Sequence, residues 1–137
     1  MSRFQLALRV GDLESSIAFY SKLLGVEPNK RRPDYANFVT VDPPLKLVLL
    51  PGEPGQKTIM DHVGFEVDSS AEVDNAAKRF DAIGFESETE AGTACCYALQ
   101  DKVWVHGPGG EPWEVYTVVA DADTLGDSAE IAAGHTR

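Results

Sequence analysis

An internal repeat is the sequence feature that most limits how this chain can fold. Each half begins with an extended apolar run, continues with an amphipathic helix that ends at a glycine, and closes with short extended runs. The two helix-ending glycines, Gly25 and Gly84, lie 59 residues apart, and the first strands, beginning at Gln5 and His62, are offset by 57 residues. Sequence identity between the halves is slight, so the repeat is one of pattern. A β-α-β-β-β unit is therefore predicted twice.

The first repeat, at about residues 3–50, has clear helix punctuation. Asp12 is suited to the N-cap, apolar side chains recur at helical spacing over 13–24, and Gly25 is suited to the left-handed C-terminal position. Prolines and aspartates then separate short extended runs. These runs are predicted at 29–32, 35–41 and 45–50.

The second repeat, at about residues 61–118, follows the same order. It is predicted to contain a strand at 62–67, a helix at about 71–83 and extended runs near 86–89, 96–100, 103–106 and 113–118. Residues 1–119 are thus expected to form one domain. The segment 120–137 is acidic, rich in small residues and without an apolar period, and we expect it to be a flexible tail.

Composition excludes several classes of partner. The chain has 137 residues, 43% of them hydrophobic, which suffices for one cored domain, and a net charge of −10 argues against nucleic acid or an anionic membrane. No apolar run approaches the roughly 20 residues of a membrane span, and no signal peptide is recognisable.

The two cysteines, Cys95 and Cys96, are adjacent and therefore poorly placed for a structural disulfide. A cytoplasmic protein is expected.

Polar residues at the start of each repeat and in the last strand suggest a metal site. A duplicated unit of this kind builds two open sheets around a cavity, where Gln5, His62 and Glu114 could converge. An ionised glutamate in an apolar strand is costly unless it is paired or bound to a metal. The matching strand of the first repeat, 45–50, offers no fourth ligand, which favours an open site. The alternative is that His62 has only a structural role, or that Glu114 faces solvent because the predicted strand is out of register by one residue.

The adjacent thiols have two interpretations. Cys95 and Cys96 could be small core residues, or they could together bind a soft element such as trivalent arsenic, cadmium or mercury. Neighbours in a regular strand face opposite ways, so both thiols reach one ligand only from an irregular loop. Two thiolates satisfy a monoorganic As(III), whereas cadmium needs more soft ligands. Lys102 is interpreted as a solvated turn lysine, with steering of an anionic group as the alternative.

The double pattern over residues 3–119 resembles the vicinal oxygen chelate superfamily, which includes glyoxalase I, extradiol dioxygenases and bleomycin- and fosfomycin-resistance proteins. More specific segments are similar to the ArsI/CadI group, which contains carbon–arsenic lyases and cadmium-induced proteins. These segments are YANF (35–38), PPLKLVL (43–49), TACCYALQDKVWV (93–105) and GPGGEPWEVY (107–116).

This resemblance implies an α+β fold with a half-barrel cavity and an Fe(II)-dependent enzyme. The enzyme would consume O₂ and cleave the carbon–arsenic bond of trivalent organoarsenicals such as methylarsonous acid, giving arsenite. His62 and Glu114 match the metal ligands of the group, and Gln5 takes a position where many relatives of the superfamily carry histidine. Cys95 and Cys96 match its substrate-holding thiols. Tyr97, Lys102 and Tyr116 are expected in the substrate cavity.

The sequence differs from the pattern of the group at two positions, and two other functions are possible interpretations. Ala94 stands where threonine is expected, and the neutral amide of Gln5 should weaken iron affinity. One rival is a cadmium-binding protein without turnover. The other is a glyoxalase-like isomerase or transferase that uses nickel, zinc or manganese, against which the missing fourth ligand argues. A small-molecule substrate and a monomer or homodimer are expected.

Overall fold

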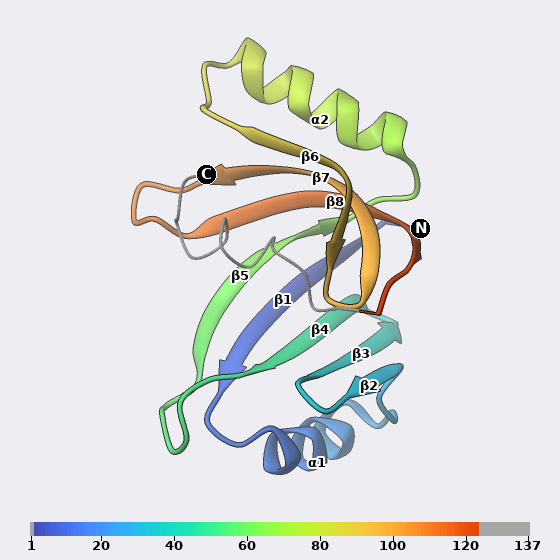
Figure 1. The fold of residues 1–137 in the computed structure, drawn as a ribbon, viewed down its shortest axis with the longest axis vertical. Helices are drawn as coiled ribbons and strands as arrows, with labels where there is room; N and C mark the ends of the chain where they lie inside the picture. The colour runs from blue at the N-terminus through green and yellow to red at the C-terminus, as the bar shows by residue number, and fades with distance from the viewer. Residues whose placement is uncertain (1, 124–137) are drawn as a thin grey trace. The chain divides into compact units, whose positions relative to one another are not determined.

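The computed structural model describes residues 2–123. The chain divides into two compact units, the first spanning Arg3–Asp61 and the second beginning at His62, so the boundary falls inside strand β5. Each unit combines one helix with a mixed sheet (Figure 1). The predicted α+β class and the predicted duplication of a β-α-β-β-β module are confirmed.

The first unit contains one helix and four strands. Strand β1 runs parallel to β4, and β2, β3 and β4 form an antiparallel meander, which gives the order β2-β3-β4-β1. Helix α1 packs on this sheet through Ile17, against a core that includes Val10, Phe38 and Leu49. The elements are β1 (Arg3–Val10), α1 (Leu13–Leu24), β2 (Lys30–Arg32), β3 (Tyr35–Val41) and β4 (Pro44–Pro51).

The ends of α1 are those predicted from the sequence. The Asp12 carboxylate accepts a hydrogen bond from the Ser15 backbone N–H at 3.1 Å, which satisfies one of the unpaired donors of the first turn. Gly25 ends the helix with φ 71°, a left-handed conformation that a side chain would oppose.

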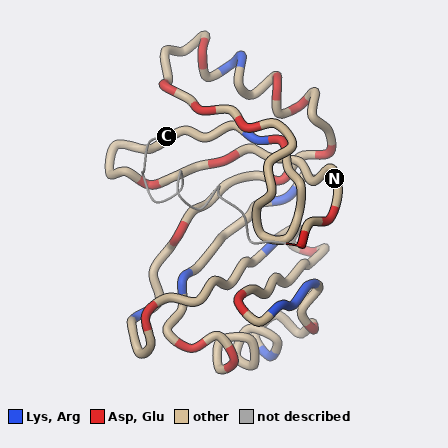
Figure 2. Tube along the Cα trace, viewed as in Figure 1, with Lys and Arg blue, Asp and Glu red and all other residues tan. Residues whose placement is uncertain are grey.

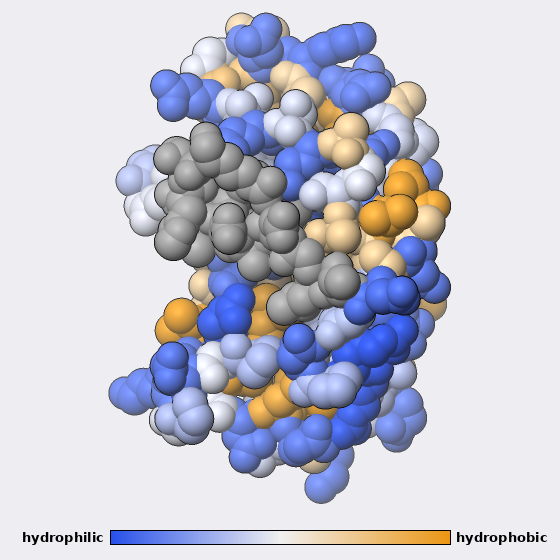
Figure 3. Space-filling view, in the orientation of Figure 1, coloured by the Kyte–Doolittle hydropathy of each residue, from blue (hydrophilic) through white to orange (hydrophobic). Residues whose placement is uncertain are grey.

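The second unit repeats this arrangement in the strand order β5-β8-β7-β6, with β5 parallel to β8. Helix α2 contacts β7 and β8 and buries Val73 and Ala76 against Val103 and Val115 (Figure 1). The solvent side of α2 is mainly hydrophilic (Figure 3). The elements are β5 (Ile59–Glu66), α2 (Ser70–Ala82), β6 (Glu88–Cys95), β7 (Ala98–His106) and β8 (Pro112–Asp121).

The sequence divided the second sheet incorrectly. The short runs expected near 86–89, 96–100 and 103–106 are two longer strands, β6 and β7, and β7 continues through the polar run at 100–102. That run resembled a turn, but its middle residue, Asp101, accepts a hydrogen bond from the Gly92 backbone N–H at 2.7 Å and so belongs to the β6–β7 hairpin. Strand β8 reaches Asp121, and residues 124–137 of the expected tail lie outside the described residues.

Acidic residues outnumber basic ones along the chain (Figure 2). Charged side chains are mostly at least partly exposed. Three are nevertheless buried within strands of the described chain: Lys46 in β4, Lys102 in β7 and Glu114 in β8. Because a buried charge is costly unless it is paired, Lys102 and Glu114 indicate where the second unit concentrates its polar interactions. Neither described helix has the length and apolar composition needed to span a bilayer.

Candidate functional site

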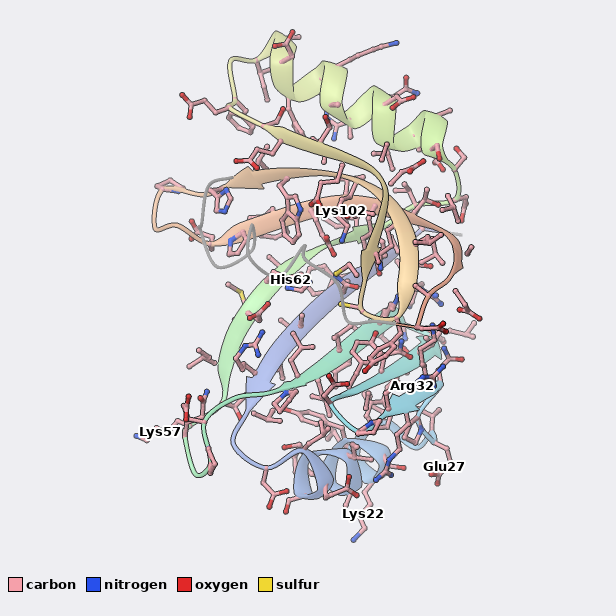
Figure 4. All side chains as sticks on the ribbon, viewed as in Figure 1. Lys22, Glu27, Arg32, Lys57, His62 and Lys102 are labelled. Carbon is pink, nitrogen blue, oxygen red and sulfur yellow. The ribbon has the colours of Figure 1, made fainter. Side chains whose placement is uncertain are left out.

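One face of the β5-β8-β7 sheet carries a buried polar cluster. Strand pairing places Glu114 beside Gly64 on one side and beside Trp104 on the other. Side chains alternate between faces along a strand, so every second residue joins the same surface, opposite α2. His62 and Lys102 both project from this surface (Figure 4). We call this group, composed of His62, Lys102, Trp104, Glu114 and Tyr116, the polar cluster.

The imidazole and the carboxylate of the cluster face each other. Nε2 of His62 lies 3.5 Å from Oε1 of Glu114, and the two residues are 3% and 2% exposed. The ring of Trp104 packs edge-on against the imidazole at a centroid distance of 5.5 Å, which restricts its rotation. The sequence therefore identified a histidine and a glutamate that do meet in the structure.

Lys102 completes the cluster, and its interpretation as a solvated turn lysine is wrong. It is 1% exposed, and its Nζ donates to Oε2 of Glu114 at 2.9 Å. The ammonium also lies 5.2 Å from the ring centroid of Trp104 and 5.5 Å from that of Tyr116. The alternative, that Lys102 steers an anionic group near the cavity, stays a prediction, because its partner in the structure is the Glu114 side chain.

Mutual attraction keeps this buried pair ionised. Burial alone would lower the pKa of Lys102 and raise the pKa of Glu114. The opposite charges outweigh burial, so the pKa of Lys102 lies above its ordinary value and the pKa of Glu114 lies below it. His62 contributes to the lowered pKa of Glu114 through a hydrogen bond.

Gly64 is required by the close approach of β5 and β8, a role the sequence analysis missed. A Cβ added here would lie 2.0 Å from the carbonyl oxygen of Glu114 and 2.9 Å from its Cγ. Both contacts are far shorter than van der Waals distance, and the first involves backbone. The available signal was a glycine inside a strand, which often marks a close approach of another backbone.

The two thiols lie at the tip of the β6–β7 hairpin. Cys95 pairs with Ala98, so Cys96 and Tyr97 form a two-residue loop, and their φ angles of 56° and 62° are the backbone signature of a type I′ turn. Non-glycine residues adopt such angles at a cost of roughly 1 kcal/mol or more each. The turn brings the sulfur atoms of Cys95 and Cys96 within 3.2 Å of each other as free thiols. This is the irregular position that joint binding by both thiols needs.

Gln100 supports this turn and was also missed from the sequence. Its Nε2 donates to the backbone carbonyl of Cys95 at 3.0 Å, and the side chain is 3% exposed. Its Oε1 is buried without a hydrogen-bond partner within residues 2–123. The hydrogen bond from the amide nitrogen anchors the turn. The amide oxygen stays available as an acceptor on the same strand face as Lys102.

The thiols have different acidities. A hydrogen bond from Cys96, partly opposed by burial and assisted by the Lys102 charge, lowers the pKa of Cys95 to about 6. The same hydrogen bond, together with burial, raises the pKa of Cys96. Cys95 also interacts electrostatically with His62 and Glu114. The thiol turn is therefore within electrostatic range of the polar cluster.

The acidity of Cys95 can be tested with two variants that each leave it the sole cysteine, Cys96→Ser and Cys96→Ala. Serine can still donate to the Cys95 sulfur, and alanine cannot. We expect the pH midpoint of Cys95 alkylation by iodoacetamide to be about one pH unit lower in Cys96→Ser than in Cys96→Ala. The reason is that a hydrogen bond to a charged group is worth roughly 1.5 kcal/mol or more. Equal midpoints, measured by mass spectrometry, would show that the hydrogen bond does not set the acidity.

The donor chemistry of the cluster fits a divalent metal. An imidazole nitrogen and a carboxylate oxygen are ligands that suit iron, manganese, nickel and zinc. Among the residues described, no three His, Cys, Asp or Glu side chains gather closely enough to hold a metal by themselves. A metal at His62 and Glu114 would therefore need a further donor of another kind. Gln5 is buried in β1 of the first unit, and its participation stays a prediction.

The predicted place of Tyr97 and Tyr116 in a substrate cavity stays a prediction. Tyr97 is the second residue of the thiol turn, and Tyr116 is fully buried with its hydroxyl donating to Oε1 of Glu66 at 3.0 Å. An apolar cavity of about 590 Å³, lined by residues such as Phe65 and Trp113, lies on the α2 side of the sheet. Glu114 borders that cavity, but its carboxylate is bound to Lys102 on the opposite face.

Comparison with known proteins gives three consistent findings. Residues 3–115 match the family model described as Glyoxalase/Bleomycin resistance protein/Dioxygenase superfamily. A trivalent organoarsenical cleaving enzyme of Thermomonospora curvata is 60% identical over 132 residues, which cover 96% of this chain and 87% of the relative. The cadmium-induced protein CadI of Mycobacterium tuberculosis is 58% identical over 126 residues, covering 92% and 82%.

The similarity of structure extends to ring-cleaving dioxygenases. A variant of homoprotocatechuate 2,3-dioxygenase from B. fuscum superimposes with a TM-score of 0.64 at 22% sequence identity, covering 88% of this chain and 33% of that chain. At this level of identity the likeness concerns the fold.

Proposed function

Because the chain belongs to the Glyoxalase/Bleomycin resistance protein/Dioxygenase superfamily, we propose that it is an Fe(II)- and O₂-dependent enzyme that cleaves carbon–arsenic bonds. Its substrates would be trivalent organoarsenicals such as methylarsonous acid, and arsenite would be released. The observation that carries the proposal is the pair of free thiols 3.2 Å apart in one turn, within electrostatic range of His62 and Glu114. The 60% identity to an enzyme named for organoarsenical cleavage supports it.

The thiol turn supplies substrate capture. The Cys95 thiolate attacks arsenic and displaces one hydroxide, which takes the proton of the Cys96 thiol and leaves as water. The Cys96 thiolate then displaces the second hydroxide. Two As–S bonds form and two As–O bonds break, with no change in the oxidation state of arsenic. Gln100 anchors the turn through the Cys95 carbonyl and so limits its movement during these steps.

The polar cluster would supply the metal site. His62 and Glu114 would hold the iron, with Gln5 as the predicted third ligand, and the bound metal would supply the binding and activation of O₂. Holding the substrate at Cys95 and Cys96 beside the cluster makes the later reaction effectively intramolecular, which is the main rate advantage that positioning offers. The buried surroundings of His62, Glu114 and Trp104 keep bulk water from this face.

The direct test is anaerobic loading with Fe(II), followed by methylarsonous acid with and without O₂, with arsenite release as the measurement. Arsenite that forms only when both iron and O₂ are present is the expected result. Arsenite formed equally without O₂ would exclude the oxygen-dependent reaction.

Single replacements of the thiols test the capture step. Cys95→Ser and Cys96→Ser are each expected to lower arsenite release at low substrate by roughly 100-fold or more, because the substrate loses its fixed position. Iron content, measured separately, should remain unchanged, since neither thiol is a proposed ligand of the iron. Wild-type rates in both single variants would remove the thiols from the proposal.

A second candidate function is capture of a soft metal without turnover. It is favoured by the same pair of sulfur donors, which suit Cd(II), and relatives of this chain are named cadmium-induced proteins. Cadmium bound at Cys95 and Cys96, with no arsenite formed under any condition, would support this candidate. A requirement for glutathione would instead indicate a glyoxalase-like isomerase or transferase.

A cytoplasmic location and a monomeric or homodimeric state also remain predictions.

A further inference from the structure

The two carboxylate oxygens of Glu114 have different partners. Oε1 faces Nε2 of His62 at 3.5 Å, whereas Oε2 accepts a hydrogen bond from Nζ of Lys102 at 2.9 Å. All three side chains are nearly excluded from solvent. The carboxylate is therefore oriented, with one oxygen turned toward the imidazole and the other occupied by a buried ammonium.

The ammonium of Lys102 is held in place by its surroundings. Its side chain is 0% exposed, and the rings of Trp104 and Tyr116 lie within 5.2 Å and 5.5 Å of Nζ. Tyr116 is itself fixed by the hydrogen bond from its hydroxyl to Glu66. Moving Nζ away from Oε2 would leave a desolvated cation unpaired and lose both ring contacts, so the hydrogen bond to Glu114 is the stable arrangement.

We propose that Lys102 is a positioning residue that restricts Glu114 to binding a metal through Oε1 alone. This inference rests on the proposed function, because it takes His62 and Glu114 as ligands. A glutamate that binds through both oxygens occupies two coordination positions. With Oε2 retained by Lys102, Glu114 occupies one, and a position stays available for exogenous ligands, as an open, substrate-activating site requires.

The ammonium of Lys102 would also be a positive charge separated from the metal only by the carboxylate of Glu114. Like charges repel, so the ammonium should lower metal affinity while it orients the ligand. Replacement by methionine, which keeps the length of the side chain, removes both effects. Glu114 would then be free to bind through both oxygens, and metal binding should become tighter.

The test is titration with Co(II) at pH 8 under anaerobic conditions, followed by the d–d absorption of the bound ion. Wild type, Lys102→Met, Lys102→Arg and the exposed control Lys78→Met would be compared. Lys102→Met should bind Co(II) about tenfold more tightly, because it removes a nearby positive charge that repels the metal ion. Its d–d bands should also lose intensity, as they do when the coordination number rises.

The comparison variants make the result specific. Lys102→Arg retains a cation that can hold Oε2 and should keep a spectrum close to wild type, as should Lys78→Met. A Lys102→Met protein with the wild-type spectrum, or with weaker Co(II) binding, would overturn the proposal. His62→Ala addresses the proposed function instead: Co(II) binding unchanged in that variant would show that the metal site lies elsewhere.

If circular dichroism shows that Lys102→Met does not fold, a crystal structure of the Co(II)-loaded wild-type protein tests the proposal instead. Oε2 of Glu114 still hydrogen-bonded to Lys102, with Oε1 alone on the metal, is the expected arrangement. Both oxygens of Glu114 on the metal would refute the inference without any variant.

Discussion

Glu114→Gln is expected to lower the free energy of unfolding by about 3–5 kcal/mol, the usual cost of removing one partner from a buried ion pair. The neutral amide leaves the ammonium of Lys102 desolvated without its opposite charge, and Lys102 is 1% exposed. The variant also replaces an anionic ligand with a neutral one, so metal binding should be lost. Urea unfolding and Co(II) titration measure the two effects separately.

Matched variants separate the ion pair from a general effect of losing one negative charge. Glu88→Gln removes a carboxylate from an exposed position in β6 and should change stability by less than about 0.5 kcal/mol. The double variant Glu114→Leu with Lys102→Met removes both buried charges, so it should recover most of the stability but none of the metal binding. A double variant less stable than Glu114→Gln would contradict this account.

The same pair predicts a dependence of stability on pH. Although burial would raise the pKa of Glu114, the charge of Lys102 holds it below its ordinary value of 4.5. A carboxylate whose pKa is lower in the folded state stabilises the fold above its ordinary pKa, and the contribution is lost as the pH falls. Wild-type stability should therefore decline below about pH 4.5 more steeply than that of Glu114→Gln.

Gly64→Ala is expected to cost about 3 kcal/mol or more and to remove metal binding, although Gly64 contributes no functional group. The added Cβ would lie 2.0 Å from the carbonyl oxygen of Glu114, so β5 and β8 would have to separate where they pair. The contact of 2.9 Å with Cγ would in addition displace the carboxylate from Lys102 and His62. Thermal unfolding and Co(II) titration would reveal both losses.

Gly109→Ala is the natural control for that substitution. Its added Cβ would approach the Glu111 side chain no closer than 3.4 Å, an ordinary contact, and Gly109 is not among the glycines with positive φ. Its stability and Co(II) binding should match wild type. Wild-type behaviour in Gly64→Ala as well would mean that β5 and β8 can separate without moving Glu114.

The duplicated module, the helices and most strand positions of the first unit could be predicted from the amino-acid sequence alone. These features depend on patterns local to each element: apolar spacing, the Asp12 cap, and Gly25 with its φ of 71°. Local patterns also identified His62 and Glu114, because polar residues in otherwise apolar strands stand out. The adjacent cysteines also stood out for their residue chemistry, and their binding of substrate stays a prediction.

The contacts that these residues make depend on strand pairing, and they could not be predicted from the sequence. Lys102 resembled a turn lysine because its neighbours in sequence are polar, yet pairing with β8 places it on the buried face beside Glu114. Gly64 and Gln100 acquire their roles from a neighbouring strand or turn. Cross-strand register is set by packing over the whole sheet, and a slip of one residue would move all these side chains to the other face.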